Sequence, residues 1–127
     1  MRVSACRLNR DKGETTMAVV QIVINQNGPL PISTSFQALG DGPVLLMISG
    51  SAWTQAQDVQ IGAELFIDGI SVGTAWLFAN QSGSHMALVT VMIPYMISYA
   101  EHQITLSPLN KETSSDSNDS YLVTLLY

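Results

Sequence analysis

One stretch of the sequence limits the possible folds more than any other. It reads HMALVTVMIPYMI, spans residues 85–97 and is apolar at nearly every position. A helix needs roughly 20 apolar residues to cross a bilayer, and this stretch is shorter and contains Pro94. We therefore expect a β-strand that is buried on both faces and no membrane span. Such a strand needs a cover on each side.

The rest of the chain is typical of an all-β domain. Runs of β-branched, aromatic and aliphatic residues alternate with turn-forming residues, and no segment shows a convincing helical period. In FIDGIS, Asp68 and Gly69 can both adopt positive φ, which predicts a tight antiparallel hairpin. The eight predicted strands are Val19–Asn25, Ile32–Ala38, Val44–Ser51, Val59–Ile67, Ile70–Ala79, His85–Ile93, Glu101–Ser107 and Ser120–Tyr127.

These strands fall into two groups by their side-chain alternation. The second, fourth, fifth and seventh alternate apolar with polar residues, which is typical of a sheet with one face in water. In the fifth strand this alternation directs Trp76 to the core. The first, third, sixth and eighth strands are apolar on both faces. Because an eight-stranded jelly roll forms its two sheets from these two groups, we predict an antiparallel jelly-roll sandwich with one sheet covered on both sides.

Three segments resemble the tumour necrosis factor and complement globular head family. They are DGISVGT (68–74), EHQITLSPLN (101–110) and DSNDSYLVTLLY (116–127). The resemblance spans about residues 17–127 and implies a compact bacterial or viral relative that forms a homotrimer through its inner sheet. No ligand contacts are transferred, because the loops match no named member of the family.

The predicted subunit contact lies on the sixth and eighth strands. Both faces of each strand are apolar, so the pattern leaves open which face meets a neighbouring subunit. A tyrosine hydroxyl needs a partner, and it finds one more easily at the rim of an interface than in a dry core. This favours the Tyr121 face of the last strand. The predicted interface comprises Tyr121, Val123, Leu125, Tyr127, Val89 and Val91.

Charge divides the chain into two parts. Residues 1–16 hold four of the five basic residues, whereas residues 17–127 hold one lysine against eight carboxylates, a formal charge of −7. The acidic part disfavours nucleic acid as a partner, because phosphate binding needs clustered cations. We predict that residues 1–16 are a disordered tail, or precede a true start at Met17, and that 17–127 form the domain. Residues 1–16 show no apolar signal segment, and the localisation stays open between cytoplasmic and particle-associated.

Candidate functional residues are few. His85 and His102 lack the spacing of known catalytic or metal motifs, so we expect neither an enzyme nor a cofactor. The residues predicted to bind a ligand are Trp53, Tyr95, Asn80 and His85. Asp116, Asn118 and Asp119 offer oxygen ligands, but Tyr121 stands where a calcium loop needs glycine. A solvated turn held by its own side chains is therefore favoured over a metal site.

Two functions follow from these features. The first is a non-enzymatic, homotrimeric recognition head that binds a glycan or a protein. The alternative is a structural or decoration protein of a virion or tail-like particle.

Overall fold

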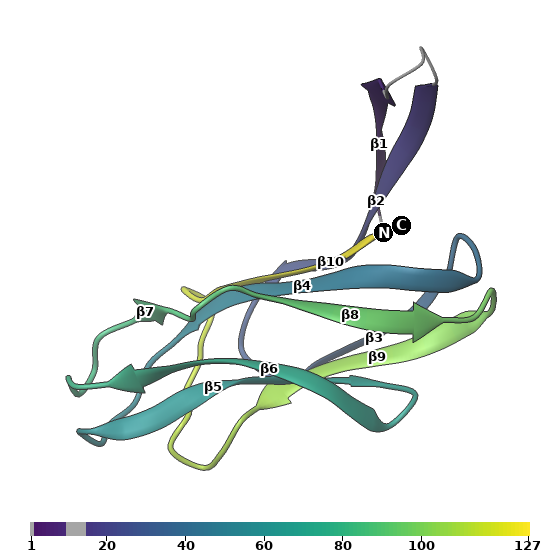
Figure 1. Ribbon diagram of the computed structural model, residues 1–127. Helices are drawn as coiled ribbons and strands as arrows, with labels where there is room; N and C mark the ends of the chain where they lie inside the picture. The colour runs from purple at the N-terminus through teal and green to yellow at the C-terminus, as the bar shows by residue number, and fades with distance from the viewer. Residues whose placement is uncertain (1, 10–14) are drawn as a thin grey trace.

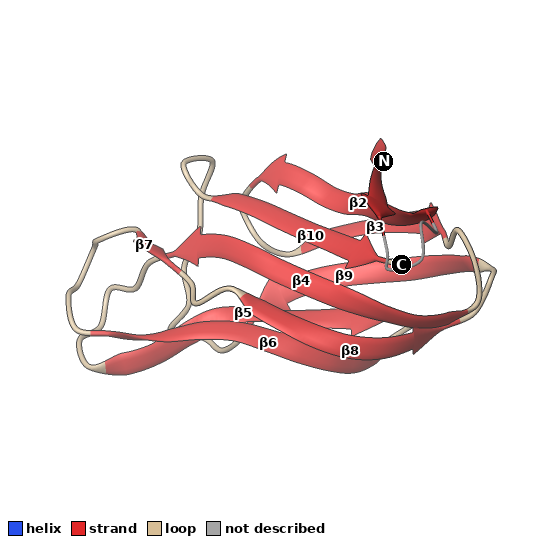
Figure 2. Cartoon of the chain, turned by 45° about the horizontal axis from the view of Figure 1, so that its top comes forward, coloured by secondary structure: helices blue, strands red, loops and turns tan. Residues whose placement is uncertain are grey.

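A computed structural model describes residues 2–9 and 15–127, with side chains from residue 18 onward. All regular elements in this described part are β-strands, and they form two antiparallel sheets packed face to face (Figure 1). A second view shows the same two layers (Figure 2). Among the described residues, no helix is long and apolar enough to span a membrane.

The sheet order confirms the predicted jelly roll. In the first sheet, β1 (Arg2–Asn9), β2 (Thr15–Asn27), β10 (Ser120–Leu126) and β4 (Gly42–Ala52) pair in that order, and β7 (Met86–Ala87) and β8 (Val91–Ile97) both pair with β4. The second sheet has the order β3 (Ile32–Gln37), β9 (Glu101–Pro108), β5 (Val59–Ile67) and β6 (Ile70–Ala79). The strands predicted to be apolar on both faces thus form one sheet, to which β1 is added at the edge, and the half-polar strands form the other.

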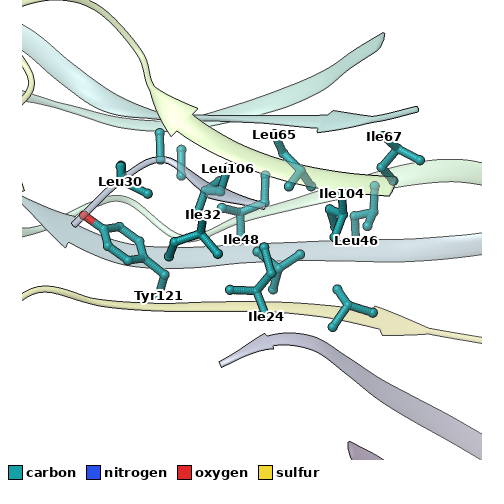
Figure 3. Close-up of a cluster of buried hydrophobic side chains, with 14 of the residues drawn as sticks. Ile24, Leu30, Ile32, Leu46, Ile48, Leu65, Ile67, Ile104, Leu106 and Tyr121 are labelled. Atoms are coloured by element: carbon teal, nitrogen blue, oxygen red, sulfur yellow. The ribbon is translucent and has the colours of Figure 1, made fainter. Parts of the chain in front are cut away.

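The core lies between the sheets and is filled by alternate residues of each strand. Leu46 and Ile48 of β4 face Leu65 of β5 and Ile104 of β9, and all four side chains are fully buried (Figure 3). Burial of such a side chain contributes roughly 1.5–3 kcal/mol. Period-two alternation therefore accounts for most of this layer.

Strand β10 directs the opposite face to the core from the one that we predicted. Tyr121, Val123 and Leu125 are at most 2% exposed, so they belong to the core and are not available for a subunit interface. The argument from the tyrosine hydroxyl was wrong because the hydroxyl finds a partner within the chain. Tyr121 donates to the Ser51 carbonyl at 2.5 Å. Tyr127, which is half-buried, likewise donates to the Gln21 side chain at 2.5 Å.

The outer face of the first sheet is also apolar, as expected for strands without a polar side. Leu45 of β4 lies between Leu126 of β10 and Pro94 of β8, and Met47 lies opposite Met92. These side chains are partly or largely exposed, and none of the strands β4, β8 and β10 carries a charged residue. The second side of this sheet is therefore uncovered within the described chain.

Strand β6 contains a β-bulge that reverses its alternation. Leu65 of β5 lies opposite Gly73, but the next residue, Phe66, lies opposite Ser71, so Val72 is an extra residue. An extra residue shifts every following side chain to the other face. As a result, Ala75 and Ala79 are buried, whereas the side chains of Trp76 and Phe78 are 48% and 55% exposed. The prediction that Trp76 faces the core was therefore wrong.

The sixth predicted strand is divided into β7 and β8. Between them, the Leu88 N–H donates to the Gly50 carbonyl of the first sheet at 2.8 Å. The Val89 N–H donates to the Trp76 carbonyl of the second sheet at 3.2 Å. This bridging segment, residues 88–90, thus connects the two sheets at one edge. Within the described residues, strand β8 pairs with β4 alone, and an edge strand tolerates a residue such as Pro94 that lacks an N–H.

Residues 1–16 were predicted to be a disordered tail or to precede a true start at Met17. Residues 2–9 form strand β1, which pairs with β2 from Thr15 to Ile22. The physical reason is that the edge of β2 presents unpaired backbone groups that can accept a further strand. Residues 1 and 10–14 lie outside the described residues. A start at Met17 and a domain of residues 17–127 stay predictions.

Candidate functional site

A groove lies where strand β6 meets the bridging segment. In both views β6 and β8 run side by side at one edge of the sandwich (Figures 1 and 2). The hollow between them has a cavity volume of about 290 Å³. We call it the aromatic groove, and its lining consists of Thr74, Trp76, Leu77, Phe78, Val89, Thr90 and Val91. None of these residues carries a charge.

Two exposed aromatic rings dominate the aromatic groove. Trp76 and Phe78 occupy alternate positions of β6, so they share its outer face, roughly 7 Å apart along the strand. Ligand sites are typically concave and apolar, with a few polar groups that orient the ligand. Thr74 and Thr90 supply hydroxyl groups in this lining. The arrangement suits a neutral ligand that has both an apolar face and hydroxyl groups.

Sequence reasoning missed Trp76 and Phe78 because it assumed unbroken alternation. One signal was available, since a glycine inside a strand often marks a bulge, and Gly73 lies directly after the extra residue Val72. A Cβ atom at Gly73 would contact the Ile93 side chain of β8, so the glycine also permits β6 and β8 to approach each other. Val89 and Val91 line the aromatic groove, and their predicted place at a subunit interface stays a prediction.

A polar site lies at the end of the sandwich where β4 finishes. We call Trp53, His85, Asp116 and Asp119 the His85 cluster. Asp119 is fully buried, and its Oδ1 lies 2.7 Å from Ser51 Oγ, which donates to it, and 2.8 Å from His85 Nδ1. Its Oδ2 accepts the Asp116 N–H at 2.9 Å. His85 Nε2 is 3.6 Å from Asp116 Oδ2, and the rings of His85 and Trp53 are 5.7 Å apart.

These contacts shift both pKa values toward the charged forms. Burial alone would raise the pKa of Asp119, but the hydrogen bonds from His85, Ser51 and the Asp116 N–H outweigh it and hold this pKa low. The hydrogen bond to Asp119 raises the pKa of His85, against a smaller opposing effect of desolvation, and the charges of Asp119 and Asp116 add to the increase. The short contact between His85 and Asp119 thus raises one pKa and lowers the other, and it couples the charges of these two side chains.

The four residues predicted to bind a ligand do not form one site. Trp53 and His85 are in ring contact within the His85 cluster. Asn80 is exposed directly after β6. Tyr95 is partly buried on β8, and its pKa is raised by burial and by the charge of Asp68, which lies in the hairpin at the other end of the sandwich. A ligand role for these four residues stays a proposal.

The three oxygen-bearing residues considered for a metal do not converge as a set. The Asn118 N–H donates to Asp116 Oδ1 at 2.8 Å, which is the side-chain-bonded turn that the sequence favoured. Asp119 instead turns toward Ser51 and His85. The side chain that joins the two aspartates is His85, which sequence spacing did not connect with them.

A second histidine–aspartate pair lies at the opposite end of the sandwich. His102 Nδ1 is 2.6 Å from Asp68 Oδ2, and His102 Nε2 is 2.8 Å from the Ser98 carbonyl oxygen. The His102 ring is buried against Phe36, at 5.6 Å between ring centroids. Asp68 and Gly69 have φ values of 51° and 80°, which confirms the predicted two-residue hairpin. This pair ties the hairpin to β9.

Comparisons with known proteins identify the fold but assign no function to either candidate site. No protein-family model matches the sequence, and no curated protein does either. Two solved structures share the fold. The first is dimeric latent PorU from Porphyromonas gingivalis, with a TM-score of 0.54 and 10% identity over 84% of this chain, which spans only 12% of PorU. The second is a family 35 carbohydrate-binding module from Clostridium thermocellum, with a TM-score of 0.50 and 9% identity over 97% of this chain and 86% of the module.

A third solved structure is more distant. It is the CBM36-1 domain of a multidomain xylanase from the hindgut metagenome of Trinervitermes trinervoides, with a TM-score of 0.45 and 15% identity over 98% of this chain and 94% of the domain. The two structures that share the fold, a part of PorU and the family 35 module, do not belong to the tumour necrosis factor family. At these identities the likeness supports the jelly-roll sandwich alone.

Proposed function

We propose that this protein is a non-enzymatic glycan-binding module and that the aromatic groove is its binding face. The observation that carries the proposal is the pair of exposed rings, Trp76 and Phe78, side by side in a hollow without charged residues. Exposed apolar patches of this kind often mark a binding site. The family 35 carbohydrate-binding module from Clostridium thermocellum, which has a similar fold, supports the choice of ligand class.

The chemistry of the aromatic groove matches a neutral sugar chain. A pyranose ring presents C–H groups on one face, and these pack against an aromatic ring, while its hydroxyl groups need hydrogen-bond partners at the rim. Trp76 and Phe78 offer the rings, and Thr74 and Thr90 offer hydroxyl groups. The formal charge of −7 on residues 17–127 disfavours anionic polysaccharides, because like charges repel at the approach to the site.

The test is a glycan array on the full chain, followed by calorimetric titration of the best ligand. We expect Trp76→Ala to weaken binding at least tenfold, which is roughly 1.4 kcal/mol, and Phe78→Ala to weaken it less. Tyr99→Ala is the matched control, because Tyr99 is also an exposed aromatic residue but does not line the groove. Circular dichroism checks that each variant is folded.

Two outcomes would contradict this assignment. If Trp76→Ala binds the ligand as the wild type does, the aromatic groove is not the binding site. Loss of binding by Trp53→Ala, with binding by Trp76→Ala intact, would move the site to the His85 cluster.

A second candidate role is assembly through the outer face of the first sheet. Met92 and Met96 are 55% and 70% exposed there, beside Leu45, Met47 and Leu126. We propose that this apolar face supports self-association, with the homotrimer implied by the sequence resemblance as the specific form. In the alternative structural role, the same face would contact a virion or tail-like particle.

Sedimentation of the full chain tests the assembly. We expect an oligomer for the wild type and a monomer for Met47→Glu, because a charge in the centre of an apolar contact is costly to bury. A wild type that sediments as a monomer at micromolar concentration would contradict self-association. The same monomer retained only by an assembled particle would favour the structural role.

A further inference from the structure

We propose that the His85 cluster binds a divalent transition metal ion of the zinc type, through His85, Asp116 and Asp119. One ligand atom from each of these residues can be chosen so that all three lie within 4.8 Å of one another. The proposal is independent of glycan binding, because no residue of the His85 cluster lines the aromatic groove.

Asp119 is the residue that points to a cation. Its side chain is fully buried, and a buried charge in a protein is normally paired or bound to a metal. Residues 17–127 contain no arginine and a single lysine, Lys111. In the described part of the chain, the only ion pair of Asp119 is the one with His85. A desolvated carboxylate whose sole cationic neighbour is a histidine is suited to accept a metal ion.

The carboxylates are held in position before any ion binds. Ser51 Oγ donates to Asp119 Oδ1, and the Asp116 N–H donates to Asp119 Oδ2. The Asn118 N–H donates to Asp116 Oδ1, so that Asp116 Oδ2 is the oxygen directed toward His85. Hydrogen bonds of this kind orient metal ligands and raise affinity. For the three ligands to close around an ion, the His85 ring must leave its hydrogen bond with Asp119 Oδ1, and the side chains of His85 and Asp116 are both exposed enough to adjust, at 37% and 41%.

The ligand set favours a zinc-type ion over calcium. Calcium takes six to eight oxygen ligands, whereas imidazole nitrogen suits zinc, copper and nickel. Imidazole nitrogen and carboxylate oxygen are both ligand types that zinc binds, and a site with three protein ligands leaves the fourth position open to water. The side chains of His85 and Asp116 are 37% and 41% exposed, so an ion reaches the site directly from solvent.

Trp53 provides a spectroscopic reporter. Its ring lies 5.7 Å from the His85 ring, and the chain contains only one other tryptophan, Trp76. In a Trp76→Phe background, the fluorescence of Trp53 therefore reports on the His85 cluster alone. Cobalt(II), which absorbs visible light according to its coordination, serves as a second probe for the same site.

The experiment uses the full chain, freed of metal by a chelator, and titrates it with zinc, cobalt or calcium chloride. We expect saturable one-to-one binding of zinc and cobalt, a change in Trp53 fluorescence and an increase in Tm, because a ligand that binds only the folded state stabilises it. Calcium at the same concentration should change neither quantity. Asp116→Asn and His85→Gln should each weaken zinc binding by roughly tenfold or more.

The controls separate this site from other metal-binding groups in the chain. Asn118→Ala retains all three ligands, His102→Gln removes the other histidine and Cys6→Ser removes the only thiol. All three variants should bind zinc as the wild type does. The proposal is overturned if zinc does not bind, if Asp116→Asn binds it unchanged, if calcium gives the larger response or if Cys6→Ser abolishes binding. Because Asp116 is partly exposed, its variant tests the site even if His85→Gln fails to fold.

Discussion

The two ends of the sandwich carry the same pair of residue types with opposite burial. Each pair joins a histidine to an aspartate 34 positions away in the sequence. At one end His102 is the buried partner, with its side chain 8% exposed against 50% for Asp68. At the other end Asp119 is the buried partner, with 0% exposure against 37% for His85.

The difference shows that burial, rather than residue type, sets the role of such a pair. A buried imidazole has an apolar body that packs on Phe36 and two nitrogens that are both occupied, by Asp68 and Ser98. It therefore contributes to the core. A buried carboxylate loses its hydration and needs every donor around it. The end with Asp119 is therefore an electrostatic site, whereas the end with His102 is a structural one.

The largest expected effect is on the buried carboxylate. Asp119→Ala should lower the free energy of unfolding by about 3 kcal/mol, because Ser51, His85 and the Asp116 N–H all lose their acceptor. Asp68→Asn should lower it by less than about 1 kcal/mol, since Asp68 is half exposed and asparagine tolerates its positive φ. Denaturation by urea measures both. If both variants lose the same free energy of unfolding, the two histidine–aspartate pairs do not differ in their contribution to stability.

A smaller effect is expected at the hairpin that His102 holds. Gly69→Val should destabilise the fold by roughly 1–2 kcal/mol, because a β-branched residue is strained at the φ of 80° found here. No atom lies within 4 Å of a Cβ at Gly69, so the cost is one of backbone conformation only. Gly40→Val is the control, since Gly40 has equal space and lacks a positive φ. If Gly69→Val has the same Tm as Gly40→Val, the turn can change its conformation without a loss of stability, and this prediction is wrong.

The smallest effect is a dependence of stability on pH that arises at the His102 end. Burial lowers the pKa of His102, but the hydrogen bonds to Asp68 and Ser98 and the charge of Asp68 outweigh it, so this pKa is raised from 6.5. The hydrogen bond from His102 lowers the pKa of Asp68 from 3.8. A raised histidine pKa stabilises the fold below pH 6.5, and this contribution disappears as the pH rises through the raised value. A lowered aspartate pKa stabilises it above pH 3.8, and that contribution disappears on further acidification.

The Tm of the wild type should therefore decline by a few degrees as the pH rises from just below the ordinary histidine pKa to well above it. His102→Gln should show a flatter profile over the same interval. Scanning calorimetry across the pH series measures the difference. An identical slope in the variant would mean that the buried ring of His102 is not charged in the folded protein.

Much of the fold was predictable because alternation is a local property of a strand. The hairpin at Asp68-Gly69 and the division of the strands between two sheets both follow from residue type and period alone. The prediction of which side chains face the core was wrong in two strands, β10 and β6. Strand β10 is apolar on both sides, so its burial depends on which side meets the opposite sheet. In β6 one extra residue, Val72, reverses the alternation and exposes Trp76.

The sequence by itself determined where most of the strands lie, which sheet each of these joins and that one sheet has strands apolar on both faces. It predicted neither β1 nor the break between β7 and β8. Only the tertiary structure decided which residues meet in a site. His85 reaches Asp119 because loops far apart in the chain converge where β4 ends and β10 begins. The aromatic groove forms because residues 88–90 cross from one sheet to the other. The alternation of side chains along a strand is set by the local backbone, so it can be predicted from neighbouring residues. The contacts of His85 with Asp119 and of residues 88–90 with β6 depend on the order of strands in the sheets, which a local sequence pattern does not predict.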